Sequence, residues 1–283
     1  MNLASMPRSL DEAVEALSAT PGALAIAGGT DLMVEINAGL LLPRAVVALA
    51  DVPELAGWTV HEGHLLLGAN LTFAQLSHPD LAVLAPALAQ AARAVGSPQV
   101  RNVGTLGGNI GTAAPTSDLL PALTALGAVV TCRGPRGWRE VPLGELLAGR
   151  RRPALLPGEL VVSVRVPLTR GPQEFIKVGR RNALAPTVAS FALVIDLDHR
   201  YIGCAAGAVA PAPVRLTEAE QWLATAIDWV VGRVADPGVY DRFGELVARQ
   251  LDPVDDYRAP AAYRRHVIAV CAARALRRAL PTR

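Results

Sequence analysis

Two uncharged, glycine-rich stretches of the sequence have the composition of ligand-binding loops. The longer one runs from Gly104 to Asp118, packs four glycines into eight positions and has no charged side chain between Arg101 and Asp118. Glycine lets a backbone approach a ligand closely and point its N–H groups at it, so a neutral loop of this kind can hold a phosphate. The shorter stretch, residues 27–32 (AGGTDL), lies far upstream and has similar chemistry. Either stretch taken alone also fits a tight buried turn.

The pattern around each stretch predicts how it is positioned. Residues 23–27 are typical of a short buried strand, and 31–37 of a helix closed by Gly39. This order of strand, glycine turn and helix presents free N–H groups and the positive end of a helix dipole to an anion. The longer stretch leads into a second predicted helix, 118–126. Together two such loops can hold a dinucleotide, which carries two linked phosphates and a long organic body.

Composition and motifs exclude several other functions. No two glycines are two residues apart and no glycine precedes a lysine, so the Rossmann and Walker A fingerprints are both absent. A net charge of +2 and 4% aromatic residues disfavour nucleic-acid binding. No run of about 18 apolar residues and no export signal occurs, so no membrane span is predicted. Three scattered cysteines, Cys132, Cys204 and Cys271, match no disulfide or metal pattern and indicate a reducing cytoplasm.

The rest of the 283-residue chain predicts an α+β protein of two domains. Ser9 and Glu12 have capping-box spacing at the start of a helix over 9–19, and a longer helix is expected over 81–95. A linker at 168–172 separates the domains. The strands expected before it are 44–49, 58–60, 65–69, 129–131, 138–141 and 160–166. The strands expected after it are 174–179, 187–197 and 201–209, followed by helices 217–226, 240–250 and 263–280.

Both glycine-rich stretches resemble the FAD-binding medium subunits of molybdenum-containing hydroxylases, the group that includes xanthine dehydrogenase and aerobic carbon monoxide dehydrogenase. Further matches follow in the family's order at 157–160 (PGEL), 175–185 (FIKVGRRNALA) and 263–266 (YRRH), so the resemblance covers nearly the full length. It implies a two-lobed, non-Rossmann FAD-binding domain over 1–168, with lobes of about 1–55 and 56–168. A small C-terminal domain of three-stranded antiparallel sheet plus helices is implied over 172–283.

The resemblance also implies where FAD binds. Backbone amides of the first stretch would hold its pyrophosphate, and the second stretch would lie against the ribityl, adenosine and flavin edge. Val162 would touch the flavin or adenine, and Lys177 would sit near the isoalloxazine, where a cation stabilises the negative charge of reduced flavin. No catalytic side chain and no metal ligand is expected. The expected cofactor-binding residues are Ala25, Ile26, Ala27, Gly28, Gly29, Thr30, Asp31, Leu32, Val95, Gly96, Thr105, Gly108, Asn109, Thr112, Asp118, Val162 and Lys177.

In such a family the chain is one subunit of a larger oxidoreductase. Electrons from a substrate oxidised at the molybdopterin cofactor of a large subunit would pass through iron–sulfur clusters of a small subunit to this FAD, then to NAD or another acceptor. The scattered cysteines agree, because they are too few and too far apart to hold a cluster here. A self-sufficient FAD-dependent oxidoreductase of the same fold is the alternative, and a binding protein that has lost FAD is a third.

One departure from the family concerns the electron acceptor. After Arg180 and Arg181 some members carry acidic residues close to the flavin ring, whereas this chain has Asn182 and an apolar run ending at Pro186. Without a neighbouring carboxylate, the arginine pair fits binding of nicotinamide-cofactor phosphates, a salt bridge elsewhere in the chain, or simple solvation. The acceptor and the role of the pair are left open.

Overall fold

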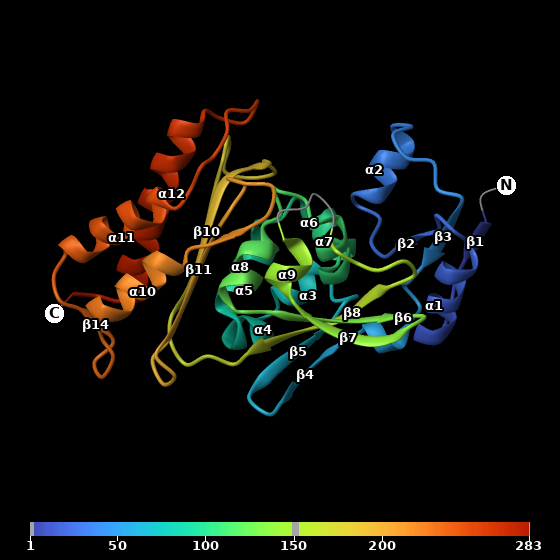
Figure 1. Cartoon of the computed structure of the whole chain (residues 1–283), viewed down its shortest axis with the longest axis horizontal. Coiled ribbons are helices and arrows are strands. Elements are labelled where there is room, and N and C mark those ends of the chain that lie inside the picture. Colours follow the sequence, from blue (N-terminus) through green and yellow to red (C-terminus); the bar gives the residue numbers. More distant parts are fainter. Residues whose placement is uncertain (1–2, 149–152, 283) are drawn as a thin grey trace.

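A computed structural model describes residues 3–148 and 153–282 of the chain (Figure 1). The N-terminal lobe is a three-stranded parallel sheet in the order β1-β3-β2, formed by β1 (Leu3–Ser5), β2 (Leu24–Ile26) and β3 (Ala45–Ala48). Helix α1 (Leu10–Ala19) joins β1 to β2, and helix α2 (Leu32–Asn37) follows β2. The hydroxyl of Ser9 accepts the Glu12 amide at 3.2 Å, so the predicted helix cap is present.

The second lobe is a five-stranded antiparallel sheet in the order β4-β5-β8-β6-β7. In β6 and in the second half of β8, buried side chains alternate with partly exposed ones, and the buried ones form a core under a layer of short helices (Figure 1). The strands are β4 (Trp58–His61), β5 (His64–Gly68), β6 (Val129–Gly134), β7 (Gly137–Pro142) and β8 (Leu160–Pro167). The helices are the 3-10 turn η1 (Pro53–Leu55), α3 (Phe73–Leu76), α4 (Pro79–Leu84), α5 (Pro86–Ala94), α6 (Pro98–Val103), α7 (Leu106–Thr112), α8 (Leu119–Ala125) and α9 (Leu143–Leu147).

Two sequence predictions for this lobe were wrong. The single helix expected over 81–95 is two helices, because Pro86 cannot donate a backbone hydrogen bond and Ala85 leaves the helical conformation. The longer glycine-rich stretch is not an open loop over its whole length. Thr105 caps helix α7, which contains three of the four glycines.

The C-terminal part is a four-stranded antiparallel sheet in the order β12-β11-β10-β9. The prediction of three strands missed β12 (Val214–Arg215), since it spans two residues and follows a proline-rich turn without strand periodicity. The longer strands are β9 (Gln173–Gly179), β10 (Thr187–Asp196) and β11 (Tyr201–Gly207). Three helices cover one face, α10 (Thr217–Ala226), α11 (Gly238–Arg249) and α12 (Ala261–Ala279), with a short ribbon of β13 (Ile227–Asp228) and β14 (Arg233–Val234).

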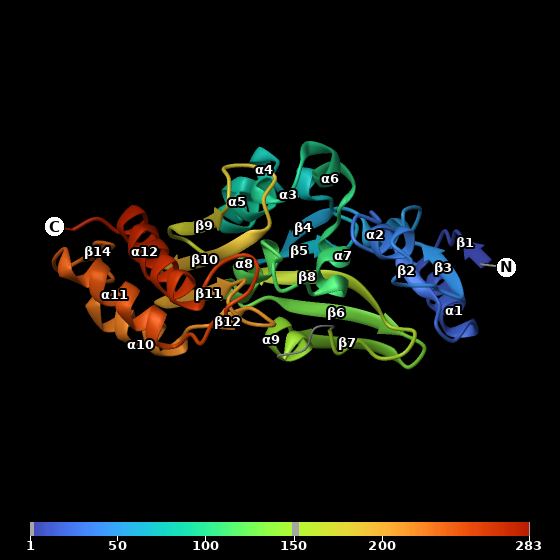
Figure 2. The same cartoon turned by 90° about the horizontal axis from the view of Figure 1, so that it is seen from above.

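This C-terminal sheet is buried on both faces. Figure 2 shows it between helices α11 and α12 on one side and α5 and α8 on the other. All ten residues of β10 are buried, and alternate side chains belong to different cores. Ala192 and Val194 join the core of the second lobe, whereas Phe191 and Leu193 join the core beneath α10–α12. The C-terminal sheet therefore contributes side chains to the hydrophobic cores of both parts of the chain. No helix in the described part of the chain is long and apolar enough to span a membrane.

Candidate cofactor site

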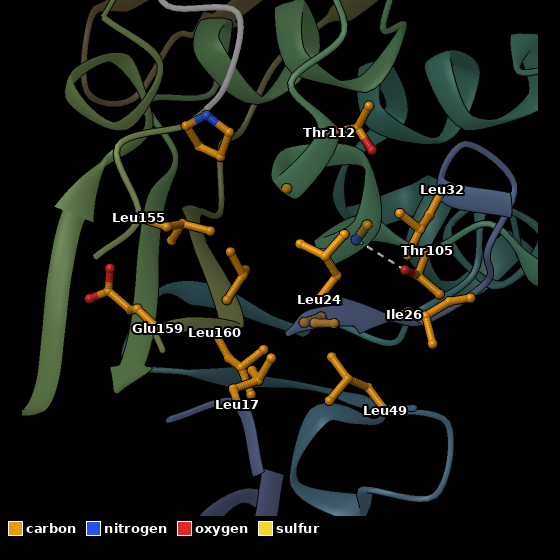
Figure 3. A pocket seen from close by; sticks show the side chains of 18 of the residues that line it. Leu17, Leu24, Ile26, Leu32, Leu49, Thr105, Thr112, Leu155, Glu159 and Leu160 are labelled. Carbon is orange, nitrogen blue, oxygen red and sulfur yellow. Dashed lines mark hydrogen bonds between the residues drawn. The ribbon is translucent and has the colours of Figure 1, made fainter. Parts of the chain in front are cut away.

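A pocket of about 990 Å³ lies between the N-terminal lobe, helix α7 and the segment that leads into β8 (Figure 3). Its size is at the upper end of the range for cofactor and ligand sites. It brings together twelve of the residues predicted from the sequence. These are Ala25, Ile26, Ala27, Gly28, Gly29, Thr30, Asp31, Leu32, Thr105, Gly108, Asn109 and Thr112.

The two glycine-rich stretches touch each other at this pocket. A Cβ atom added to Gly28 would lie 1.8 Å from the carbonyl oxygen of Val103 and 2.9 Å from the Cα of Gly104. No side chain fits in that space, so glycine at position 28 is what allows the two backbones to meet. Residues far apart in sequence thus form adjoining walls of one site.

The turn after β2 carries a row of unpaired amides. Among the described residues, the backbone N–H groups of positions 28–32 have no protein hydrogen-bond acceptor, and the helical bonding pattern starts with Met33 donating to the Gly29 carbonyl at 3.0 Å. Gly29 has φ +68°, the left-handed conformation that glycine adopts without strain. Consecutive amides in such a turn form a concave site for anions, and the diphosphate of a dinucleotide has the matching charge.

Helix α7 contributes differently from the prediction. The amides of Leu106, Gly107 and Gly108 already donate to Leu71 O, Ala69 O and Thr105 Oγ1 at 2.8, 2.7 and 3.1 Å. This stretch therefore does not offer the row of free N–H groups expected from its glycines. It offers a helix face instead. Gly108, Gly111 and Thr112 lie one turn apart and line the pocket, while Leu106 and Ile110 are buried behind them.

An apolar chamber occupies one end of the pocket. Figure 3 shows the side chains of Leu17, Leu24, Leu49, Leu155 and Leu160 facing the same space. A flat aromatic group can pack against such a surface without losing hydrogen bonds.

Val162 is the only cofactor-binding residue predicted on β8, and it does not line the pocket. It is buried, and its carbonyl accepts the Ala69 amide at 2.9 Å. Leu160 and Val161 line the pocket in its place. Both residues directly follow the turn at 157–159, so the sequence did place them near the predicted site. The alternation of side chains along a strand does not say which residue lies nearest the pocket.

The wall next to the chamber is held by an ion pair between the buried Glu159 and the partly exposed Arg139. Arg139 donates to both carboxylate oxygens of Glu159, at 2.9 and 2.7 Å, and the Leu156 amide donates to the same group at 2.8 Å. Figure 3 shows the Glu159 carboxylate turned away from the leucines. Burial alone would raise the pKa of Glu159, but the hydrogen bonds from Arg139 and Leu156 and the charges of Arg139 and Arg136 lower it overall.

This pair predicts a pH dependence of stability. The pKa of Glu159 is lower in the folded chain than in the unfolded chain, where it is near 4.5. The carboxylate therefore stabilises the fold fully above the unfolded pKa, and this stabilisation is lost as the pH falls through the folded pKa. Glu159→Gln is expected to cost about 1–3 kcal/mol in the free energy of unfolding at pH 6 and to reduce the loss between pH 5 and 3. Urea denaturation over this pH range is the measurement.

Glu140→Gln is the matched control, since Glu140 pairs with Arg165 on the same sheet but is 57% exposed. It should change the unfolding free energy by less than about 1 kcal/mol. Equal effects of the two substitutions would contradict the role given to Glu159.

Asp118 and Lys177 lie together at a second, smaller pocket of about 470 Å³, which Lys177 lines. Lys177 Nζ donates to Asp118 Oδ2 at 2.5 Å and to the Ala94 carbonyl at 2.9 Å. Asp118 is 5% exposed and also accepts the Thr187 hydroxyl at 2.6 Å. It makes no cap hydrogen bond to helix α8. The lysine keeps one further donor for a group in the pocket.

Val95 and Gly96 line neither pocket. They follow helix α5, and their carbonyls accept the Arg101 guanidinium at 2.9 Å each. Arg181 also binds main-chain oxygens, donating to the carbonyls of Ala183 and Leu184 in its own loop. Within the described residues, neither Arg180 nor Arg181 is within ion-pair distance of a carboxylate.

Comparisons with known proteins agree with this arrangement. Residues 3–169 match the family described as the FAD binding domain in molybdopterin dehydrogenase, and residues 174–279 match the CO dehydrogenase flavoprotein C-terminal domain. The nicotinate dehydrogenase FAD-subunit of Eubacterium barkeri is 34% identical over 78% of this chain and 78% of its own length. The carbon monoxide dehydrogenase medium chain of Afipia carboxidovorans is 29% identical over 96% of this chain and 94% of its own.

Solved structures show the same fold over the full length. One chain of quinoline 2-oxidoreductase from Pseudomonas putida 86 superposes with a TM-score of 0.88, covering 99% of this chain and 96% of that chain at 26% identity. A chain of the reconstituted CO dehydrogenase from Oligotropha carboxidovorans gives 0.89, covering 99% and 97% at 27% identity.

Proposed function

The chain belongs to the FAD-binding medium subunits of the molybdenum hydroxylases, and from this membership we propose that it carries electrons between partner subunits and an external acceptor. It is an FAD-binding oxidoreductase subunit. Electrons released at a molybdopterin cofactor in a large subunit reach it through iron–sulfur clusters of a small subunit and leave to NAD or another acceptor. The three cysteines are buried and unpaired, which is consistent with work in the cytoplasm.

The observation that carries this proposal is the row of free amides at 28–32 on the wall of a pocket large enough for a dinucleotide. These amides would hold the diphosphate of FAD. Helix α7 gives the cofactor a flat surface at Gly108 and Gly111, where a larger side chain would occupy its space. The leucine side chains at one end of the pocket would pack against an aromatic end of FAD. The chain thus supplies binding and orientation, and FAD supplies the chemistry of taking up and releasing electrons.

Lys177 is the charged residue proposed to tune the cofactor. Its side chain is 15% exposed and borders the second pocket, and its ammonium group is held by Asp118 and the Ala94 carbonyl. A cation held in a partly desolvated site stabilises developing negative charge more than a solvated one does. We place the flavin end of the cofactor on this side, so that Lys177 favours the reduced form.

The pocket lining favours an electron carrier over a self-sufficient enzyme. Among its described residues the carboxylates are Asp31, Glu35 and Glu159, and Glu159 is already bound to Arg139. Asp31 and Glu35 are exposed beside the turn that holds the diphosphate, which is not where a substrate would be deprotonated. The substrate of the complex is set by the partner that holds the molybdopterin.

Isolation of the chain with its natural partners tests the proposal. The complex is expected to contain FAD, molybdenum and iron, and its flavin band is expected to bleach when a substrate of the molybdenum subunit is added. The chain expressed without partners should bind FAD but show no turnover with organic donors. Turnover by the isolated chain would instead support a self-sufficient oxidoreductase, and a colourless preparation would contradict FAD binding.

A further inference from the structure

A partly buried ionic cluster in the C-terminal part lies behind the Asp118–Lys177 pair. Asp256 accepts Nε and Nη2 of Arg258 at 2.9 and 2.5 Å, and it also accepts the guanidinium of Arg264. Arg264 is 1% exposed, and its Nε has no hydrogen-bond partner. The hydrogen bond from Arg258 and that from Arg264 hold the pKa of Asp256 well below its usual range, although burial opposes them.

The cluster contains two guanidinium groups and one carboxylate. Its surplus positive charge makes the remaining N–H groups strong donors to main-chain oxygens. Arg258 Nη1 donates to the Thr187 carbonyl at 3.3 Å, and Arg264 Nη1 donates to the Ala208 carbonyl at 3.3 Å. Both acceptors lie at strand ends, Thr187 at the start of β10 and Ala208 just after β11.

Both carbonyls belong to residues that hold the segment before helix α8. The Thr187 hydroxyl donates to Asp118, which in turn binds Lys177. The Ala208 amide donates to the Pro115 carbonyl at 3.1 Å. Ala208 has φ +63°, a left-handed conformation that is unfavourable for a non-glycine residue and persists only where neighbours hold it. Two separate hydrogen-bonded routes therefore run from one cluster to the same segment.

We propose that Arg258 and Thr187 are positioning residues for the flavin site, which keep Asp118 oriented so that Lys177 presents its ammonium group to the second pocket. The inference rests on the proposed function, because it concerns how Lys177 acts on bound FAD. Without the Thr187 hydroxyl or the support of its carbonyl, Asp118 is free to rotate and carry Nζ of Lys177 with it. The expected result is a weaker preference of the protein for reduced over oxidised FAD.

The test is a redox titration of the FAD-loaded protein. Lys177→Met, Arg258→Met and Thr187→Val are each expected to lower the flavin reduction potential, by about 30 mV for each tenfold loss of preference for the reduced form in a two-electron couple. Arg258→Met leaves Asp256 and Arg264 as a balanced pair, and Thr187→Val is nearly isosteric, so both should fold. In a Lys177→Met background, neither substitution should lower the potential further, because the residue through which they act is gone.

Arg265→Met is the matched control. Arg265 lies on α12 next to Arg264 and pairs with Asp252, an aspartate of the segment before that helix, but both side chains are exposed. It should leave the potential unchanged. The positioning role is overturned if Arg258→Met and Thr187→Val lower only the melting temperature, or if their shifts add to that of Lys177→Met. These results would leave the proposed function standing, whereas absence of flavin from the wild-type protein would remove both.

Discussion

Gly111→Leu is expected to lower the affinity for FAD by at least about a hundredfold, or about 2.8 kcal/mol, without destabilising the fold. Gly111 lies on the face of helix α7 that lines the pocket, and a Cβ atom added there meets no protein atom within 4 Å. The leucine side chain would therefore extend into the space of the cofactor. Leucine also has a higher helix propensity than glycine, so the substitution should not lower the stability of the fold. Flavin fluorescence titration of the apoprotein measures the affinity.

Gly144→Leu is the control for this experiment. Gly144 also lies within a short helix, α9, is exposed, and likewise has nothing within 4 Å of an added Cβ, but it does not line the pocket. It should bind FAD like the wild type. If Gly111→Leu retained full flavin content, the cofactor would not lie along α7 and the binding site proposed above would be wrong.

Gly28→Ala is expected to remove FAD binding and to cost about 3 kcal/mol in the free energy of unfolding, the upper part of the range for overpacking. The added methyl group would lie 1.8 Å from the Val103 carbonyl oxygen, and main-chain atoms cannot move aside as a flexible side chain can. The two glycine-rich stretches must then separate, which also moves the amides at 28–32. Urea denaturation and flavin content of the purified protein are the two measurements.

Gly203→Ala separates the loss of stability from the loss of FAD binding. Its Cβ atom would lie 1.9 Å from the Ala125 carbonyl oxygen, a nearly identical clash with backbone, but between β11 and α8, away from the pocket. A similar loss of stability is expected, with unchanged FAD affinity in the folded fraction at low temperature. Should Gly28→Ala bind FAD as well as Gly203→Ala does, the contact between the stretches would not be needed for the site.

Much of the fold could be predicted from the periodicity of apolar residues and from the turn residues between elements. Helix 217–226 was predicted to the residue, and the predicted strands 129–131 and 138–141 lie within β6 and β7, since local pattern and tertiary packing agree in both places. The family resemblance was confirmed, and with it FAD. Helix α7 could not be predicted from the local sequence pattern. Its glycines look like loop residues, yet Gly107 is required because Ala69 lies 2.7 Å from where its Cβ would be.

The residues that line the larger pocket were easier to predict from the sequence than the role of each one. Glycine content indicated close backbone approach, but not which stretch keeps its amides free. That depends on Ala69 and Leu71, which accept the α7 amides and lie outside both motifs. The partners of Lys177 were also invisible in the sequence. Asp118 and Ala94 lie 59 and 83 positions before it in the chain. The pairing of β9 with β10 places Thr187, which binds Asp118, at the same end of the sheet.

The shared sheet has a consequence for how the polypeptide folds as it leaves the ribosome. Residues up to β8 emerge first, but Phe175, Ala192, Val194 and Ala205 complete their hydrophobic core. Until those residues have been synthesised, helices α5 and α8 keep an apolar side open to water, an arrangement that chaperones bind. A nascent chain stalled before β9 should therefore remain protease-sensitive, and the cofactor pocket should become rigid only late in synthesis.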